Sequence, residues 1–259
     1  MSDQGPLVIK VGGSTLGSAD TTFGDIAALE RKGARPIVVH GGGAEASRWL
    51  EAMGIQSRFV DGLRVTDSSV LPIVVAVLSG LVNKRIVSAL NAAGVRAVGI
   101  SGADGRILEC EQRRPELGFV GIPVAVNPEP VIALRVAGFI PVVAPVGFVS
   151  TADGDQLVNV NADEAAGWIA QAVNACEIVF LTDVEGVRGE NGQVLSELNA
   201  FAVRDLRERG VIAGGMIPKT EAALLAASLG VPSHIIDGRI PAALLEREGR
   251  GTVFPPEVL

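Results

Sequence analysis

The sequence predicts an α/β fold, a three-layer α/β/α sandwich around a mainly parallel central sheet. Short runs of β-branched and other apolar residues alternate with segments of helical periodicity along the chain, which is the pattern of βαβ units. The strand runs are apolar at nearly every position, as is typical of parallel strands that helices cover on both faces. No repeat with a period of 20–50 residues is present. We therefore expect one α/β domain over residues 1–259.

Three strands are predicted in the first hundred residues, with helices between them. Residues 7–11 (L-V-I-K-V), 36–40 (P-I-V-V-H) and 95–101 (V-R-A-V-G-I-S) are the strand runs. Apolar residues at i, i+3, i+4 and i+7 predict a helix after each of the first two strands. The residues with this spacing are Phe23, Ile26 and Ala27 in the first helix and Ala46, Trp49, Leu50 and Met53 in the second.

A long helical pattern covers residues 67–93, with Thr66 or Asp67 as its N-cap and Gly94 as its stop. Its apolar run, residues 70–82, is the longest of the chain but is too short to span a bilayer. The N-terminus is short and polar and lacks the pattern of a signal peptide. These features predict a cytoplasmic protein with no membrane partner.

The second half of the chain returns to alternating strands and helices after an irregular segment. Residues 106–126 alternate weakly and contain several glycines and prolines, so we expect a hairpin there. Buried strands are predicted at 139–145 and 177–183, with a helix starting near Asn161 between them. The remaining predicted elements are a helix over 215–229, a strand over 233–237 and a C-terminal helix.

Composition and charge exclude several classes of function. The net charge is −7, and nucleic acid is therefore disfavoured as a partner because phosphate backbones bind to basic faces. Cys110 and Cys176 are the only cysteines and have no metal-ligand spacing, so neither a disulfide framework nor a zinc site is expected. Small anionic ligands remain possible because local lysines and backbone N–H groups can bind them.

Two predicted strands end in glycine-rich turns that lead into helices: K-V-G-G-S at 10–14 and V-H-G-G-G-A at 39–44. Glycines let the backbone approach an anion closely, and helix N-termini supply N–H donors. Neither turn has the spacing of a P-loop or of a G-x-G-x-x-G dinucleotide turn. Because ligands of such sheets bind outside the carboxyl ends of the strands, both turns are candidates for a site.

Two lysines lie beside glycines in comparable settings. Lys10 stands inside the first strand, where a charge is costly. It is either an edge-strand lysine that reaches solvent or a lysine directed at phosphate. Lys219 follows Pro218 near a predicted helix N-terminus, where the helix dipole disfavours a cation unless an anion is bound. The alternative for Lys219 is an ordinary surface lysine.

The segment N-V-N-A-D-E at 159–164 has a partial structural explanation. Asn161 and Glu164 form a capping-box pattern, and Asp163 suits the first turn of a helix. The box does not explain Asn159, which precedes the cap.

Arg64 and His40 are further polar residues in connecting positions. Arg64 could bind a carboxylate through two parallel hydrogen bonds, although a lone arginine is more often part of a surface ion pair. His40 ends the second strand, and we favour a structural hydrogen bond to the backbone over catalysis. No nucleophile–histidine arrangement or metal-ligand cluster is legible.

Taken together, these segments resemble the amino acid kinase family, and within it the branch that phosphorylates N-acetyl-L-glutamate. The resemblance covers nearly the whole chain and implies an N-terminal lobe (1–174) for the acyl amino acid and dimerisation, and a C-terminal lobe (175–259) for ATP. It rests on K-V-G-G-S, V-H-G-G-G, G-L-R-V-T, N-V-N-A-D, L-T-D-V-E-G-V and G-G-M-I-P-K-T, in that order.

The resemblance also implies a role for individual residues. Lys10 and Lys219 match the lysines that stabilise the transferring phosphoryl group, and Asp163 matches the aspartate that holds them. The acceptor-binding positions are Gly42, Gly43, Arg64, Asn159 and Asn161. The ATP-binding positions are Gly12, Gly13, Asp183, Val184, Glu185, Gly186, Val187, Arg188, Val211, Ile212 and Ala213.

The implied reaction is ATP-dependent phosphorylation of the γ-carboxylate of N-acetyl-L-glutamate, the second step of arginine biosynthesis. A carboxylate is already ionised at pH 7 and needs no general base. What the transfer needs is positioning and positive charge, which two lysines and a Mg²⁺ ion carried by the nucleotide would supply. We expect no metal ligands from protein side chains.

Other readings of the sequence remain. A relative of lysine biosynthesis shares G-L-V-N-K-R (80–85) and A-V-G-I-S-G-A-D-G (97–105) and phosphorylates aminoadipate on a carrier protein. Aspartate kinases carry extra regulatory domains. A non-catalytic nucleotide-binding regulator would have lost Lys10, Asp163 or Lys219, and a nicotinamide dehydrogenase would want an acidic residue in place of His40.

The start of the first strand near residue 7 leads to one further expectation. It leaves no room for the extra N-terminal helix that links arginine-inhibited relatives into hexamers. We therefore expect a homodimer without strong inhibition by arginine.

Overall fold

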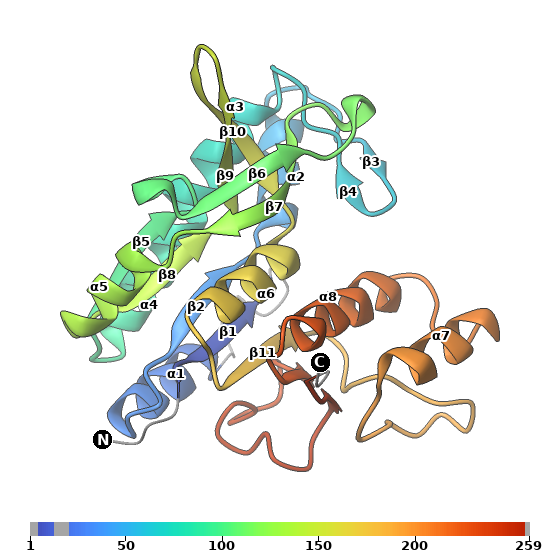
Figure 1. The fold of residues 1–259 in the computed structure, drawn as a ribbon. Coiled ribbons are helices and arrows are strands. Elements are labelled where there is room, and N and C mark those ends of the chain that lie inside the picture. The colour runs from blue at the N-terminus through green and yellow to red at the C-terminus, as the bar shows by residue number, and fades with distance from the viewer. Residues whose placement is uncertain (1–4, 13–20, 257–259) are drawn as a thin grey trace.

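The computed structural model describes residues 5–12 and 21–256, and within them a seven-stranded sheet forms the centre of the molecule (Figure 1). The strand order is β13-β12-β11-β1-β2-β8-β5, and only the pairing of β12 with β13 is antiparallel. This confirms the mainly parallel α/β sheet. The strands are β1 (Leu7–Val11), β2 (Ile37–His40), β5 (Ala97–Ser101), β8 (Ile140–Ala144), β11 (Glu177–Thr182), β12 (Ser233–Asp237) and β13 (Thr252–Phe254).

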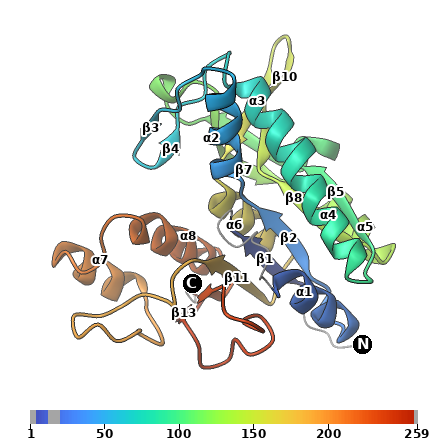
Figure 2. The same cartoon turned by 180° about the vertical axis from the view of Figure 1, so that it is seen from behind.

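Helices cover both faces of this sheet, as the continuous apolar strands predict. Alternate residues of a strand point to opposite faces, so Val8 packs in one core while Leu7 and Ile9 pack in the other. The view from behind shows the face covered by α1, α2 and the long helix (Figure 2). That face carries α1 (Thr22–Arg31), α2 (Gly43–Ala52), α3 (Leu71–Val75) and α4 (Asn83–Ala92), and the other carries α5 (Glu129–Val136), α6 (Ala162–Ala172) and α8 (Met216–Ser228), with α7 (Ala200–Glu208) packed beside α8.

The predicted long helix is present but contains a wider turn. Helices α3 and α4 are joined by a π-helical segment, η2 (Ala76–Val82), which gives a continuous helix over Leu71–Ala92. The turn that precedes it, residues 68–70, is closed by Asp67, whose side chain accepts the N–H groups of Ser69 and Val70. Gly94 follows its end with φ +84°. The predicted end at Gly94 is therefore confirmed, whereas the helix starts at Leu71 with Val70 as its N-cap, so the predicted N-cap at Thr66 or Asp67 is wrong.

This helix is also longer than the apolar run from which we excluded a membrane span. Among the described residues it is the one helix whose 22 residues and mean hydropathy of 1.7 would suffice to cross a membrane. Length alone is therefore no argument against a span. However, Val74, Val82 and Ile86 are buried against the sheet, and a helix packed inside a protein core has the same length and composition.

A second, smaller sheet lies beyond the carboxyl ends of β8 and β5. The predicted hairpin is present as the antiparallel pair β6 (Leu108–Gln112) and β7 (Val120–Val126). It closes into a four-stranded barrel with β9 (Val146–Thr151) and β10 (Gly154–Val160), which the sequence analysis missed. A small hairpin, β3 (Phe59–Val60) and β4 (Leu63–Arg64), projects beside it, with single 3-10 turns at Asp104–Arg106 and Pro115–Leu117.

The predicted C-terminal helix is wrong. Residues 238–251 form successive turns and lead into β13, which pairs antiparallel with β12. Ala242 has φ +59°, a left-handed conformation that an α-helix cannot contain. Pro241 lacks the N–H that a continuing helix needs.

Candidate active site

Lys10 lies near the carboxyl end of β1, the central strand of the sheet. Because β1 pairs with β11 on one side and β2 on the other, the edge-strand alternative for Lys10 is wrong. Its Nζ lies 2.7 Å from Oδ1 of Asp163, and the two side chains are 12% and 21% exposed. A charge this far from solvent is stable only with a partner, and Asp163 provides it.

The first turn of α6 sets the position of Asp163. Asn161 is the N-cap, and its side chain accepts the backbone N–H groups of Asp163 and Glu164. The predicted cap is therefore confirmed. The reciprocal half of the capping box is not formed, because the Glu164 carboxylate instead accepts two hydrogen bonds from Arg113, both 2.7 Å long.

A cavity of about 150 Å³ lies between the glycine turn after β2 and the start of α6. All five residues assigned to acceptor binding line it: Gly42, Gly43, Arg64, Asn159 and Asn161. They come from three separate stretches of the chain. Apolar side chains also line the cavity, among them Phe59, Leu63, Val74, Leu78 and Val120.

Arg64 is a buried residue of this cavity and not part of a surface ion pair. It is 7% exposed, and its guanidinium donates to Gly43 O (2.8 Å), Ser47 Oγ (2.8 Å) and Ser57 Oγ (2.7 Å). Burial lowers the pKa of Arg64 from its usual value. An arginine that is bonded only to neutral groups has a charge available for a carboxylate ligand.

The sequence analysis missed the two serines that hold Arg64. Ser47 lies one helical turn after Gly43 on α2, a spacing that could have indicated its position. Ser57 has no such signal, because it stands in an irregular segment. Asn159, which the capping pattern left unexplained, donates to Thr66 Oγ1 at 3.1 Å.

The glycine turn after β2 needs glycine for two reasons. Gly42 has φ +148°, and a Cβ there would lie 2.7 Å from Cδ2 of Leu78. The turn thus sits directly against the π-helical segment. It is also tied to the turn after β1, because Gly41 N–H donates to Val11 O at 2.9 Å. Gly12 is buried beside this contact, and Gly13 lies outside the described residues.

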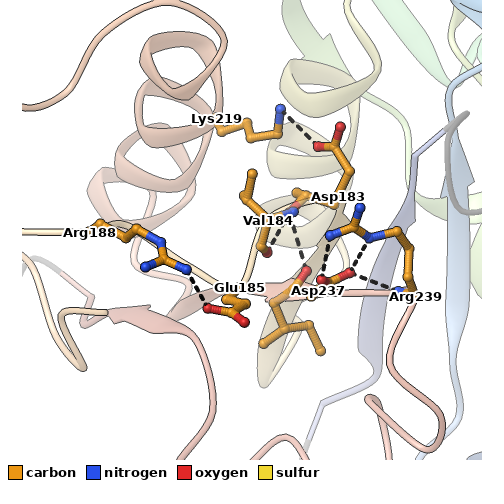
Figure 3. A network of polar contacts seen from close by, with 9 residues as sticks. Asp183, Val184, Glu185, Arg188, Lys219, Asp237 and Arg239 are labelled. Carbon is orange, nitrogen blue, oxygen red and sulfur yellow. Dashed lines mark hydrogen bonds and ion pairs between the residues drawn. The ribbon is translucent and has the colours of Figure 1, made fainter. Parts of the chain in front are cut away.

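Lys219 lies in the first turn of α8, as predicted, but it does not contact Asp163. Its Nζ is 3.6 Å from Oδ1 of Asp183, which follows β11 (Figure 3). It also donates to Gly215 O at 3.4 Å. The structure therefore brings together Lys10 and Asp163, and separately Lys219 and Asp183.

The stretches assigned to ATP surround this second pair. In Figure 3, Glu185 and Arg188 form an ion pair (2.8 Å) beside Asp183, while Arg239 holds Asp237 at the end of β12 (2.7 Å). Hydrogen bonds from Arg239 lower the pKa of Asp237. Four of the residues assigned to ATP have side chains that are buried in the core or packed against it: Val184, Val187, Val211 and Ile212. Gly186 has φ +151°, and Ala213 is exposed.

Carboxylates at this edge of the sheet are already paired. Asp163 binds Lys10 and Asp183 faces Lys219. Within residues 5–12 and 21–256, no three His, Cys, Asp or Glu side chains gather as a metal site requires.

Comparison of the chain with known sequences gives consistent matches along its length. The profile of the amino acid kinase family matches residues 5–237. The acetylglutamate kinase of Dehalococcoides mccartyi (strain 195) is 45% identical over 248 residues, which are 95% of this chain and 91% of that protein. The acetylglutamate kinase of Cereibacter sphaeroides (strain ATCC 17029) is 48% identical over 256 residues, or 96% and 87% of the two chains.

Solved structures agree on the fold. A Streptococcus mutans UA159 crystal structure has a TM-score of 0.83 at 27% identity and covers 97% of this chain and 98% of its own. The carbamate kinase of Giardia has a TM-score of 0.72 at 16% identity and covers 99% and 100%. At that identity the likeness concerns the fold alone.

Proposed function

The chain belongs to the amino acid kinase family, and from this premise we propose that it transfers the γ-phosphoryl group of ATP to the γ-carboxylate of N-acetyl-L-glutamate. The product is N-acetyl-L-glutamyl 5-phosphate, and the reaction is a step of arginine biosynthesis. The relatives at 45–48% identity over most of the chain are acetylglutamate kinases.

The observation that carries the proposal is the acceptor cavity beside the Lys10–Asp163 pair. The cavity is lined by a buried arginine, the glycine turn and two asparagines, Asn159 and Asn161. These groups suit an acyl amino acid: Arg64 faces the α-carboxylate, and the asparagines face polar groups. The apolar walls accept the methyl end of an acetyl group.

The chemistry requires little proton transfer from the protein. The γ-carboxylate is the nucleophile and is ionised at neutral pH. Lys10 and Lys219 place positive charge where negative charge spreads over the transferring group. Asp163 keeps Lys10 in position at 2.7 Å. Lys219 contacts Asp183 over the longer distance of 3.6 Å, so it is free to turn toward phosphate oxygens.

The nucleotide is assigned to the C-terminal lobe, residues 175–259, and the acyl amino acid to the N-terminal lobe, residues 1–174. The backbone of the stretch from Asp183 to Arg188, that of Val211–Ala213 and the glycines after β1 are the proposed nucleotide contacts. Mg²⁺ would be held by the phosphates and would neutralise part of their charge, since Asp163 and Asp183 both face lysines.

The test is an ADP-release assay with four acceptors: N-acetyl-L-glutamate, glutamate, aspartate and carrier-linked aminoadipate. We expect turnover with N-acetyl-L-glutamate only. Turnover with the carrier-linked acceptor instead would assign the chain to the lysine-type branch. If the protein binds ATP but turns over none of the acceptors, the result would favour a non-catalytic nucleotide-binding regulator.

We propose a cytoplasmic homodimer without strong arginine inhibition. Strand β5 supports a dimer because, in the described part of the chain, it is paired on one side only, with β8. Sedimentation velocity should give one species of twice the chain mass. A hexamer, or inhibition by sub-millimolar arginine, would contradict this proposal.

A further inference from the structure

Two polar side chains lie in the core behind the acceptor cavity and have no part in the chemistry above. His40 ends β2 and Asn83 begins α4, directly after the π-helical segment. Both side chains are 0% exposed. Burying a histidine and an amide costs free energy unless every polar atom has a hydrogen-bond partner.

The Asn83 amide joins three strands of the sheet. Its Nδ2 donates to Val142 O of β8 (2.9 Å) and to Ile100 O of β5 (3.2 Å), and it lies 3.2 Å from Nε2 of His40. Carbonyl oxygens only accept, so the amide nitrogen must face them, and its two hydrogens are shared among the two carbonyls and the ring. The amide nitrogen cannot accept, so Nε2 is the ring nitrogen without a proton. The Asn83 Oδ1 is bound in turn by Nζ of Lys84 at 3.0 Å.

This fixes the tautomer of His40. With Nε2 accepting, the ring proton is on Nδ1, which donates to Gly41 O at 2.7 Å. Burial lowers the pKa of His40 to about 4, and the charge of Lys84 contributes to the lowering. The imidazole is thus neutral at physiological pH and acts through its hydrogen bonds alone.

A hydrogen bond to Gly41 O controls the next N–H group of the chain. A trans peptide is planar, and its C=O and N–H point in opposite directions. With the Gly41 carbonyl directed at the imidazole, the Gly42 N–H must point away from it. Gly42 lines the acceptor cavity, and none of the hydrogen bonds found in the described residues occupies its N–H.

We propose that His40, aligned by Asn83, is a positioning residue that aims the Gly42 N–H at the acceptor and the transferring phosphoryl group. This inference rests on the proposed function, because it assigns a role within the same site. An N–H directed at developing negative charge stabilises the transition state more than the ground state. Its misalignment should therefore lower kcat more than it raises KM.

Two substitutions of His40 distinguish the role of Nδ1 from the role of Nε2. His40→Asn keeps a donor at the position of Nδ1 and should keep kcat within about tenfold of wild type, since it loses only the bond to Asn83. His40→Gln keeps a polar group at the position of Nε2 but loses the bond to Gly41, so kcat should fall on the order of 10²–10³-fold. KM for ATP should stay unchanged in both.

His234→Gln is the matched control. His234 is also buried, but it lies at the other lobe, where its Nε2 contacts Arg250 O at 2.5 Å. This variant keeps a polar group at the position of Nε2 but loses the contact of Nδ1 with Oε1 of Glu177 (3.5 Å), so it should lose stability without the fall in kcat. If the His40→Asn and His40→Gln variants lose kcat equally, or if the loss is in KM alone, the inference is overturned.

A measurement on the wild-type protein covers the case in which the variants do not fold. Addition of N-acetyl-L-glutamate should slow amide hydrogen exchange at Gly42 by at least tenfold. Unchanged exchange at Gly42 in a wild-type protein that turns over N-acetyl-L-glutamate would refute the inference and leave the proposed function intact. A wild-type protein without turnover would refute the proposed function itself.

Discussion

Lys10 and Asp163 show how a charged residue is accommodated in a parallel sheet. Lys10 sits between β2 and β11 and has the Asp163 carboxylate at 2.7 Å. The pair lies at the carboxyl edge, where the first turn of α6 brings Asp163 to the strand ends. The charge of Lys10 is balanced inside the protein and still faces the side at which ligands bind.

Replacing either lysine should abolish most of the activity. We expect Lys10→Ala and Lys219→Ala each to lower kcat on the order of 10²–10³-fold, because each removes positive charge from the transferring group. Lys10→Ala should also destabilise the protein, since it leaves Asp163 half-buried without its partner. Steady-state kinetics and denaturant unfolding check both. Near-normal turnover in either variant would refute the assignment.

Arg64 should affect the acceptor and not the nucleotide. Arg64→Lys removes the planar fork that bonds Ser47, Ser57 and a carboxylate. The KM for N-acetyl-L-glutamate should rise about 10- to 100-fold, the effect of losing one charge-assisted hydrogen bond, with KM for ATP unchanged. Arg58→Lys, at an exposed position nearby, is the control and should leave both constants unchanged. An equal rise in both KM values would argue against the role.

At the scale of elements, local signals predicted local structure well. The long helix, the cap at Asn161 and the strand from Glu177 depend on residues close in sequence, and all are present, although the helix starts at Leu71 and not at Asp67. The five residues proposed for the acceptor were predicted from short segments of a shared family pattern, and they line one cavity.

The elements that the sequence did not reveal depend on distant or irregular contacts. The barrel requires β6 to meet β9 and β7 to meet β10, and no periodicity signals such pairing. Lys219 contacts Asp183, whereas a contact with Asp163 was expected. These residues lie on separate elements, and the spacing of residues in the sequence does not show which side chains of separate elements meet. The C-terminal helix was predicted without bounds after the strand at 233–237, in spite of Pro241 and the glycines that follow this strand.

The turn at Gly42 should not tolerate a side chain. Gly42→Ala puts a Cβ at φ +148° and within 2.7 Å of Leu78, so the free energy of unfolding should fall on the order of 1–3 kcal/mol. KM for the acceptor should rise as the turn shifts. Gly80→Ala, on the adjacent π-helical segment with nothing within 4 Å, should be neutral or stabilising by up to about 1 kcal/mol. Equal changes in the free energy of unfolding for Gly42→Ala and Gly80→Ala would contradict the explanation from backbone conformation and close packing at Gly42.

At the scale of the whole molecule, one sheet runs through both lobes. Strands β2 and β8 belong to the lobe proposed for the acceptor and β11 and β12 to the lobe proposed for the nucleotide, with β1 between them. Helix α6 crosses this junction and packs in the same core as β1 and β11. The two halves of the site are therefore parts of one folding unit.

The free energy of unfolding should depend on pH because His40 titrates differently in the folded and unfolded states. Its pKa is about 4 in the folded state and 6.5 without burial, so the folded state binds fewer protons and stability is lost as pH falls from 6.5 toward 4. Lys84 is the charged group that faces the ring. Between pH 7 and pH 5 the loss should be about 2 kcal/mol.

Denaturant unfolding at the two pH values measures this loss. His40→Asn should lack that part of the pH dependence, since asparagine does not titrate. The same pH dependence in this variant and in wild type would show that other groups cause it.

The place of β1 in the sheet has a consequence for biosynthesis on the ribosome. Its partner β2 follows within thirty residues, but its other partner begins only at Glu177, opposite Leu7. At roughly 5–20 residues per second, about seven to thirty seconds pass between the two pairings. During that time one edge of a strand of valine and isoleucine is open to other nascent chains. A lysine within such an edge discourages intermolecular pairing, so Lys10 would protect the chain from aggregation before it ever meets Asp163.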